Sequence, residues 1–473
     1  MGGTHAKGAI FKVVAWRCVE GKMHCLRARD WEYVGEGNLH LVCRYNPTDG
    51  SEYVHFKGKV LRLTKEVDYV IALRSQELSS TISTNILNPF FGSDIVVESE
   101  LVPLPFGFIS ELSVLVHECR PALRRQKSLN EEAKYGEVMF DATRLFRVAS
   151  LSNHVEAVSV DLKVKCGLKS SSPFVTPGRS IKQEYGRFHV MQLYKSVLSG
   201  AEVSTYDPCD LCSGCKARVG AALKCLATTP QNNFSIQSQS QGQDQTSSGI
   251  FSNADVLVDA LSTILSSEHE TVLQRLQLLQ SFDLIDIEGA ACIFERLKKQ
   301  LSSSVDALEV FMCDSFRDFD YSLLTGLEEA IGGVRGAGNV VSETLETLLS
   351  LRTSRHDEDR QLRALEWVET LTVQDSVALL QLWLLALAAK DTSLVVALAV
   401  VEPSVLLTQV ATANCGFINL TTMDERKVVI AYNLALVDFG LKHPRKCWSL
   451  ENREIEIMKT LSLETNSTND NPR

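Results

Sequence analysis

The chain has 473 residues, of which 45% are hydrophobic and 22% charged, and its formal net charge is -10 at pH 7. This length allows two or three domains with buried cores, and the composition is that of an ordinary globular protein. The acidic balance and the lack of a long Lys/Arg run argue against bulk nucleic-acid binding, which needs an extended basic surface.

The sequence also limits where the protein works. Its first residues carry scattered charges and no apolar run before a small-residue cleavage site, so we expect no secretory signal. The most apolar stretch, residues 377–389, is shorter than the ~18–20 residues of a membrane span, and we interpret it as a buried helix. Thirteen cysteines without disulfide-framework spacing fit a reducing compartment. We therefore expect an intracellular protein, in the cytoplasm, the nucleus or both, with no membrane span.

The first predicted elements are three strands. Residues 31–43 predict a strand, a glycine turn and a second strand, and residues 56–63 predict a third strand. Gly35 and Gly37 allow the backbone to approach a ligand closely and to turn its N–H groups toward phosphate oxygens. A plain hairpin turn is the alternative interpretation of this Gly-x-Gly pattern.

Positive charge is concentrated in residues 161–195, which hold seven Lys/Arg against two acids. Alternation in a strand places Asp161, Lys163 and Lys165 on one face. That face would be costly to bury without a bound polyanion. Asn232 and Asn233 follow in a segment that offers neutral amide donors and acceptors. The pattern favours a densely phosphorylated small molecule, with a solvated basic face and an Asn-rich turn as the alternative.

The sequence after residue 234 predicts mainly helices. Residues 235–248 form a Gln/Ser tract that we predict to be a disordered loop. Apolar residues recur at helical spacing from 254 to 301, and residues 302–370 also predict helices. A helix is predicted from residue 374 to Lys390, followed by strands at 391–400 and 428–437.

An Asp-Phe-Gly triplet closes the second of these strands at residues 438–440. The same triplet holds magnesium in protein kinases. A protein kinase is nevertheless disfavoured, because His40 replaces the third glycine of its phosphate loop and the sequence has neither a Val-Ala-x-Lys strand nor a His-Arg-Asp loop.

Four blocks, in order, resemble the signature blocks of the inositol-pentakisphosphate 2-kinases. They are residues 161–167 (Asp-Leu-Lys-Val-Lys-Cys-Gly), 186–195 (Gly-Arg-Phe-His-Val-Met-Gln-Leu-Tyr-Lys), 206–214 (beginning Tyr-Asp-Pro) and 229–234 (Thr-Pro-Gln-Asn-Asn-Phe). The resemblance implies an α+β, two-lobed kinase-like fold with a small β-rich N-terminal lobe and a larger C-terminal lobe. It also implies ATP-dependent phosphorylation of the 2-hydroxyl of inositol 1,3,4,5,6-pentakisphosphate to give inositol hexakisphosphate (phytate).

The resemblance further implies how the nucleotide and the metal are held. Lys163 would neutralise charge on the transferring phosphoryl group, Asp391 would orient the inositol hydroxyl and accept its proton, and Asp438 would hold Mg²⁺. Without the family, the favoured interpretation of Asp391 is a strand-start cap. The implied nucleotide-binding residues are Gly35, Glu36, Gly37, Asn38, Arg62, Asp141 and Asp161, with residues 137–141 as the inter-lobe hinge and Asp161 on the ribose.

A second implied set binds the inositide, namely Arg124, Lys165, Lys195, Asn232, Asn233, Lys442 and Lys446. Within the resembling blocks, the chain departs from the family pattern at two positions. Val164 replaces a proline, and Met191 stands where a substrate-contacting histidine is common. The segment after Lys442 is also shorter, which leaves Arg445 or Lys446 as the next basic contact. These departures motivate an alternative, a catalytically degenerate kinase-like protein that binds inositol polyphosphates as a regulatory or structural ligand.

Cys209, Cys212 and Cys215 form a Cys-x2-Cys-x2-Cys run, with Cys225 as a candidate fourth ligand for zinc. Cys209 and Cys212 stand where the family carries large apolar residues, and cysteine packs as a small hydrophobe. We therefore expect no structural zinc.

These patterns divide the chain into an N-terminal extension (1–27), a nucleotide-binding lobe (28–160), a lobe with the inositide site and catalytic carboxylates (161–463, with a disordered loop at 235–249) and a disordered tail (464–473). The expected partner is the inositol polyphosphate substrate, with no nucleic acid, and we expect a monomer.

Overall fold

The computed structural model describes residues 26–37, 39–47, 55–65, 78–145, 156–238, 249–267, 269–332, 343–353, 359–401, 415–421, 425 and 427–469. The chain forms two compact units, one of residues 1–73 and 98–141 and the other of residues 74–97 and 142–473. The predicted boundary at residue 160 therefore differs from the observed division. The difference arises because residues 156–163 form a strand that pairs with residues 393–400 in the larger unit.

The smaller unit contains a five-stranded antiparallel sheet with strand order β1-β2-β3-β5-β4. Its strands are β1 (Trp31–Glu36), β2 (His40–Tyr45), β3 (Lys59–Thr64), β4 (Ser99–Pro103) and β5 (Tyr135–Phe140). The unit's helices are η1 (Ala28–Asp30), α3 (Phe108–Val116), η3 (His117–Cys119) and α4 (Ala122–Arg125).

The first three predicted strands are confirmed in this sheet. Alternate residues of β2 point inward, because Leu41 and Cys43 are fully buried while their neighbours are half-buried. They pack with Leu61, Leu63 and other apolar residues in one core. The register between β1 and β2 shifts between Tyr33 and Gly35, which forms a bulge where the glycine turn begins.

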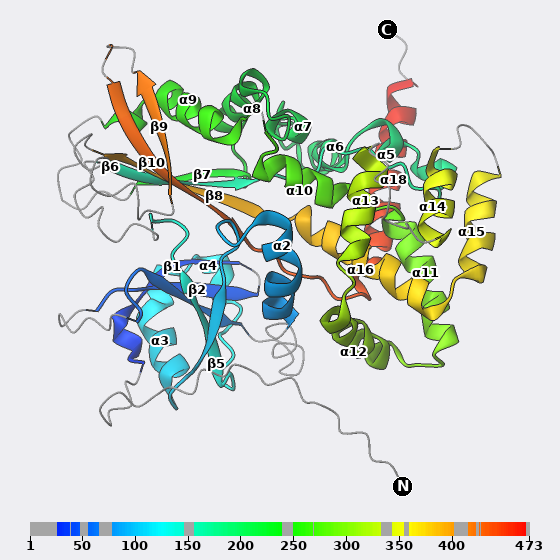
Figure 1. Cartoon of the computed structure of the whole chain (residues 1–473), viewed down its shortest axis with the longest axis horizontal. Helices are drawn as coiled ribbons and strands as arrows, with labels where there is room; N and C mark the ends of the chain where they lie inside the picture. Colours follow the sequence, from blue (N-terminus) through cyan, green and yellow to red (C-terminus); the bar gives the residue numbers. More distant parts are fainter. Residues whose placement is uncertain are drawn as a thin grey trace. The chain divides into compact units, whose positions relative to one another are not determined.

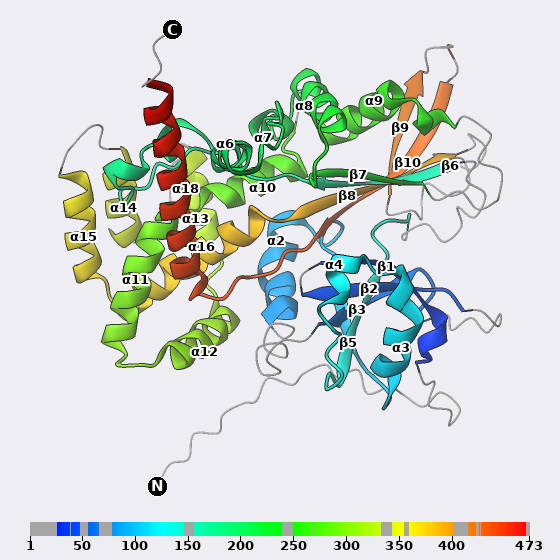
Figure 2. The ribbon, with the colours of Figure 1, turned by 180° about the vertical axis from the view of Figure 1, so that it is seen from behind.

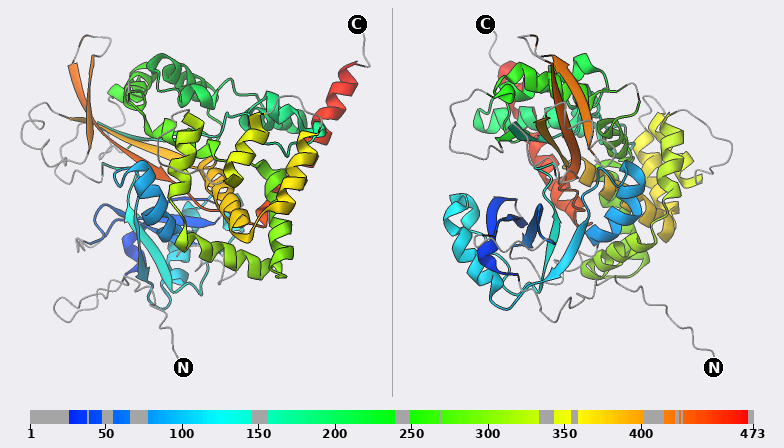
Figure 3. Two further views of the ribbon diagram at one scale, coloured as in Figure 1. Left: turned by 45° about the vertical axis from the view of Figure 1, so that its right-hand side comes forward. Right: turned by 60° about the vertical axis from the view of Figure 1, so that its left-hand side comes forward.

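The larger unit contains a second five-stranded antiparallel sheet with strand order β7-β6-β8-β10-β9. Its strands are β6 (Glu156–Lys163), β7 (Phe234–Ser238), β8 (Ser393–Val401), β9 (Gly416–Thr421) and β10 (Lys427–Val437). All nine residues of the central strand β8 are buried. The orange strands β9 and β10 run side by side in both panels of Figure 3.

Helices cover this sheet and extend well beyond it. Figures 1 and 2 show α8 and α9 near the strands and a second group, including α11, α14, α15, α16 and α18, beyond one end of them. The helices before residue 300 are η2 (Ser83–Leu87), α2 (Asn88–Phe91), η4 (Pro177–Arg179), α5 (Ile181–Glu184), α6 (Arg187–Ser199), α7 (Pro208–Leu211), α8 (Lys216–Thr228), η5 (Ile250–Ser252), α9 (Ala254–Leu265), α10 (Val272–Ser281) and α11 (Asp286–Gln300). The later ones are α12 (Val305–Ser315), η6 (Phe316–Asp318), α13 (Ser322–Gly332), α14 (Glu343–Thr353), α15 (Arg360–Thr370), α16 (Val373–Ala389) and α18 (Lys446–Asn469).

The apolar stretch at residues 377–389 is confirmed as a buried helix, because every residue of α16 from Leu379 to Ala389 is buried. A capping box at Thr372 and Asp375 begins this helix. In the part of the chain that the structure describes, no helix combines the length and the apolar character of a membrane span.

Two predictions of disorder need correction. Residues 235–238 of the Gln/Ser tract complete strand β7, because their backbone groups pair with β6 whatever their side chains. Residues 239–248 lie outside the described residues. The tail predicted from residue 464 begins inside α18, which continues to Asn469. Two antiparallel sheets with many separate helices confirm the α+β class.

Candidate functional site

The predicted basic strand face begins on β6. Asp161 lies opposite Ser235 on one side and Val395 on the other, and Lys163 lies opposite Ser393. The expectation that Lys165 continues this face was wrong, since the strand ends at Lys163 and Lys165 has a left-handed backbone with φ 62°. A side chain in that conformation no longer follows the strand alternation.

The turn at Lys165 nevertheless brings the predicted charges together. Burial lowers the pKa of Lys165, the carboxylate of Asp391 opposes this shift, and the ammonium groups of three other lysines add to it. Those three are Lys163, Lys195 and Lys442. The Gln280 amide fixes the turn by donating a hydrogen bond to the Lys165 carbonyl oxygen at 2.9 Å. We call Asp161, Lys163, Lys165, Lys195, Asp391, Asp438 and Lys442 the charge cluster.

Asp161 is a half-buried member of the charge cluster on β6. Burial raises the pKa of its carboxyl group, Lys163 and the adjacent Ser393 hydroxyl oppose this, and Asp438 adds to the increase. The Ser393 hydroxyl lies beside the carboxyl group without completing a hydrogen bond of good geometry, and Asp161 Oδ1 is buried with no hydrogen-bond partner among the described residues. An unpartnered buried carboxylate oxygen is the acceptor that a ligand hydroxyl would need.

The two remaining carboxylates lie at one end of neighbouring strands. Asp391 lies between α16 and β8, and its backbone N–H donates to the Ala388 carbonyl oxygen at 3.0 Å. Asp438 directly follows β10, whose last residue, Val437, lies opposite Ser393 at the start of β8. The Lys442 ammonium lies 3.5 Å from Asp391 Oδ2, and 54% of the Asp391 side chain is exposed. Both carboxylates are therefore open to a ligand.

The predicted amides divide into one buried and one exposed residue. Asn233 is buried, and its carbonyl oxygen accepts a hydrogen bond from the Lys163 N–H at 2.9 Å. Its side-chain Oδ1 has no hydrogen-bond partner in the described part of the chain. Asn232 is exposed. The backbone bond therefore holds Asn233 directly beside the charged end of β6.

In the smaller unit, the Glu36 side chain is engaged by other protein groups. The Arg120 guanidinium donates to both carboxylate oxygens at 2.9 Å, and the Lys65 ammonium forms an ion pair with the same carboxylate. These cations lower the pKa of Glu36 although burial opposes them. Lys65 also donates to the Gly37 carbonyl oxygen at 2.8 Å. Glu36 therefore fixes the glycine turn and leaves no oxygen free for a nucleotide.

The other predicted nucleotide residues of this unit are also partnered. Arg62 forms an ion pair with the buried Glu137, although its Nε is buried without a partner among the described residues. The Asp141 carboxylate accepts from Arg44 Nε at 2.6 Å. Asp141 is the last residue of the smaller unit, and its role as a hinge residue stays a prediction. Asn38 lies outside the described residues.

The remaining predicted inositide contacts are cationic, and Arg124 is half-buried whereas the two lysines are exposed. Arg124 lies on α4 in the smaller unit, and Lys195 is exposed on α6. Lys446 is exposed at the first residue of α18. The guanidinium of Arg445, the other candidate for this contact, pairs with Asp306 at 2.6 Å and with Glu309.

The cysteine run adopts three different environments. Cys212 is buried, and Cys215 is exposed at the N-cap of α8. Burial raises the pKa of Cys209 to about 11, whereas backbone N–H groups of Arg218 and Ala217 lower that of Cys215. Within the described ranges, these cysteines do not form a group of three ligand atoms close enough for a metal ion.

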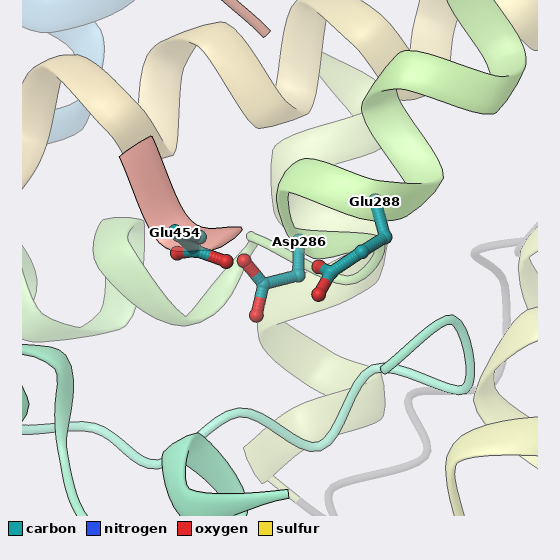
Figure 4. Close-up of side chains that lie close together, drawn as sticks. All are labelled: Asp286, Glu288 and Glu454. Carbon is teal, nitrogen blue, oxygen red and sulfur yellow. The ribbon is translucent and has the colours of Figure 1, made fainter. Parts of the chain in front are cut away.

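A buried ion cluster was missed by the sequence analysis. The carboxylates of Asp286, Glu288 and Glu454 lie within 4.8 Å of one another, where α11 and α18 meet (Figure 4). The Lys182 ammonium lies 2.6 Å from Glu288, 2.8 Å from Glu454 and 3.2 Å from Asp286. It occupies the position that a metal ion would take. Burial acts to lower the pKa of Lys182, but the three carboxylates act more strongly in the opposite direction. The net effect raises the pKa, so the ammonium stays charged.

This cluster also corrects the composition argument for residues 161–195. Arg179 pairs with Glu288 at 3.1 Å, and Arg187 pairs with Glu454 at 2.8 Å. Together with Lys182, three of the seven basic residues are neutralised inside the unit. The sequence pattern could not reveal this neutralisation, because the acidic partners of these three residues lie about 100 to 270 residues away.

Comparison with known proteins places the chain in a family. The sequence pattern described as inositol-pentakisphosphate 2-kinase matches residues 33–455. The chain belongs to the inositol-pentakisphosphate 2-kinase family. A protein of that name from Danio rerio is 33% identical over 218 residues, which are 44% of this chain and 42% of that protein. One from Arabidopsis thaliana is 28% identical over 319 residues, which are 56% of this chain and 68% of that protein.

A third relative, from Oryza sativa subsp. indica, carries the same name and is 28% identical over 244 residues, which are 46% of this chain and 54% of that protein. The matches to the Danio rerio and Oryza sativa proteins thus span about half of their length. The family match covers both the glycine turn and the charge cluster, so both regions lie inside the part of the chain that carries the family pattern.

Proposed function

We propose that this chain transfers the terminal phosphoryl group of ATP to the 2-hydroxyl of inositol 1,3,4,5,6-pentakisphosphate, giving inositol hexakisphosphate. The observation that carries the proposal is the charge cluster. Lys163, Lys165 and Lys195 have no ion-pair partner in the described part of the chain, although they lie close enough to one another to repel. A ligand with several phosphates would supply the missing negative charge.

Asp391 is suited to accept the proton of the attacking hydroxyl. Its exposed carboxylate borders the cationic group, and Lys442 holds one of its oxygens at 3.5 Å. Phosphoryl transfer asks the protein mainly for positioning and charge neutralisation. Lys163, two residues after Asp161 on β6, would neutralise charge on the transferring group.

Magnesium would fit the carboxylates at this end of the sheet. Asp438 is exposed directly after β10, so its carboxylate oxygens can be offered to a nucleotide-bound ion. Bound magnesium would offset negative charge on the phosphates. The Asp286 triad is a poorer candidate, because the Lys182 ammonium already holds its three carboxylates.

We further propose that the two units correspond to the two lobes of a kinase-like fold. The smaller would contribute Gly35, Gly37 and Arg62 to the ATP phosphates, and the larger would contribute Asp161 to the ribose. Arg124 and Lys446 would add inositide contacts to those of the charge cluster. Each charge-assisted contact supplies about 1.5–3 kcal/mol. The intracellular location and the monomeric state remain predictions.

The test incubates the purified chain with magnesium, labelled ATP and inositol 1,3,4,5,6-pentakisphosphate, and separates the products by anion-exchange chromatography. We expect hexakisphosphate from the wild type and none from Asp391→Asn, with nucleotide binding retained in both. Loss of ATP affinity in Asp391→Asn would mean that the residue supports the fold instead.

The same experiment separates the degenerate alternative from the kinase. If no hexakisphosphate forms, calorimetry measures binding of the pentakisphosphate to the wild type. Tight binding without turnover would replace the proposed kinase with a regulatory or structural binder of inositol polyphosphates, and absence of both would remove the inositide site.

A further inference from the structure

A polar cavity lies in the larger unit, and two of its lining residues are sequence neighbours of charge-cluster residues. Its volume is about 160 Å³, which is the space of about five water molecules at ~30 Å³ each. It is lined by the loop after β6 and by residues of α6, α10, α14 and α18. No member of the charge cluster lines it, although Cys166 and Lys390, direct sequence neighbours of Lys165 and Asp391, form part of its wall.

The lining of this cavity carries excess positive charge. Its cations are Lys169, Lys182, Arg187, Arg352 and Lys390, and its anions are Asp283, Asp286 and Glu454. Three of the cations are paired with these anions: Lys390 with Asp283, Lys182 with Asp286 and Arg187 with Glu454. Lys169 and Arg352 remain, and among the described residues neither has an acidic partner within ion-pair distance. The cavity therefore has two positive charges without counter-charge.

Arg352 is held by a neutral group. Its Nε donates to Ser171 Oγ at 3.0 Å, and its Nη2 bonds the same oxygen. Arg360 Nη2 donates to the Ser171 carbonyl oxygen at 2.7 Å, which brings a second guanidinium to the same residue. Arg360 Nε is buried and has no hydrogen-bond partner in the described ranges. Two like charges thus converge on one serine that offers no negative charge.

The surroundings of Arg352 make this arrangement unfavourable without an anion. Burial lowers the pKa of Arg352, and the neighbouring Arg360 lowers it further. Asp283 opposes these effects but is already held by Lys390. A partly desolvated charge needs a counter-charge or hydrogen bonds to a charged group. A guanidinium fork matches the oxygens of a phosphate group in two places.

We propose that this cavity binds a phosphate group, with Arg352 and Lys169 as its charged ligands and the Ser170 and Ser171 hydroxyls as neutral ones. Phosphate could come from two sources, the free inorganic ion or one phosphate of an inositide bound at the charge cluster. The proposal does not depend on kinase activity, because binding alone is measured.

The first experiment uses the full chain in phosphate-free buffer at constant ionic strength and follows thermal unfolding as inorganic phosphate is added. A ligand that binds only the folded state raises the midpoint with the logarithm of its concentration. We expect the apparent Kd for phosphate to rise at least tenfold in Arg352→Gln and in Lys169→Gln. Lys169 is exposed, so its variant tests the site even where Arg352→Gln fails to fold.

Lys299→Gln is the matched control. It removes one positive charge from an exposed position on α11 outside this cavity, and its phosphate response should equal that of the wild type. Absence of any phosphate effect in the wild type overturns the proposal. An equal effect in the wild type and both cavity variants also overturns it, because phosphate would then bind elsewhere.

The second experiment distinguishes the two phosphate sources with Lys195→Gln, which weakens the charge cluster, and with inositol hexakisphosphate. If the cavity takes the free ion, the effects of phosphate and hexakisphosphate on the midpoint add, and Lys195→Gln keeps its phosphate response. If the cavity takes an inositide phosphate, hexakisphosphate competes with the ion and binds more weakly to Arg352→Gln. Either result supports the phosphate site and identifies its source.

Discussion

The glycine turn of the smaller unit and the charge cluster of the larger unit carry similar residue types but differ in how their charges are satisfied. In the turn, the Glu36 carboxylate is shared by Arg120 and Lys65, so every charge has a protein partner. In the charge cluster, Lys163 and Lys165 have no such partner among the described residues. We infer from this difference that Glu36 stabilises the turn, whereas Lys163 and Lys165 are left available for a ligand.

Breaking the turn should have the largest effect on stability. Glu36→Gln leaves Arg120 and Lys65 buried without a counter-charge, and removal of one partner of such a buried group typically destabilises by about 3–5 kcal/mol. Urea unfolding measures this loss. Glu118→Gln is the control, because that carboxylate is 83% exposed and its loss should change stability little. Equal stability of Glu36→Gln and the wild type would contradict the structural role.

Removing a charge from the cluster should instead affect turnover. Lys163→Met should lower kcat by about 10²–10³-fold, the effect of losing one group that stabilises developing negative charge. Its unfolding midpoint should stay near that of the wild type, because Lys163 is only half-buried. Lys224→Met, on the exposed face of α8, should leave kcat unchanged. An unfolding midpoint that falls together with kcat would instead assign Lys163 to the fold.

A smaller effect is expected for substrate affinity. Lys165→Ala removes one charge-assisted contact of about 1.5–3 kcal/mol, which raises KM for the pentakisphosphate by about 10- to 150-fold. Steady-state kinetics with varied pentakisphosphate measures this change, and Lys216→Ala on the exposed surface is the matched control. An unchanged KM for Lys165→Ala would remove this residue from the inositide site.

The smallest effect is a pH dependence in the smaller unit. Burial, together with Arg62 and Lys65, lowers the pKa of His40 from 6.5 to about 3. The unfolded chain therefore binds a proton that the folded chain does not, and stability is lost as pH falls from about 6.5 toward 3. Comparing urea midpoints at pH 8 and pH 5 should show a smaller loss in His40→Gln than in the wild type. Equal losses in both proteins would show that His40 titrates normally.

Local patterns predicted most of the secondary structure. Local composition predicted β2 and β10 as strands, and the apolar stretch of α16, interrupted by Gln381, predicted a helix that is buried from Leu379 to Ala389. The positive φ of Lys165 was not predictable, because the turn depends on its tertiary surroundings, including the Gln280 amide. The sequence analysis therefore placed Lys165 correctly near Lys163 and Asp391, but it did so by extending the strand alternation past the true end of the strand.

Ion pairs between residues far apart in the sequence are the second feature that the sequence analysis could not predict. Lys182 reads as one more cation of a basic segment, yet its partners belong to helices that begin 100 residues or more further along. Glu36 reads as a turn residue because Arg120, its partner, lies 84 residues away. No local pattern links such residues, so their charges cannot be assigned to the fold or to a ligand before the tertiary structure is known.

The ion pair between Lys182 and Glu454 also limits when the larger unit can fold during translation. The two residues are separated by 272 positions, and the central strand β8 pairs with β6 across a similar span. While the ribosome is still translating, the Lys182 ammonium would lack one of its three carboxylates until residue 454 has emerged. The larger unit must therefore complete its folding late, after translation of almost the entire chain, whereas the smaller unit has all its strands by residue 140.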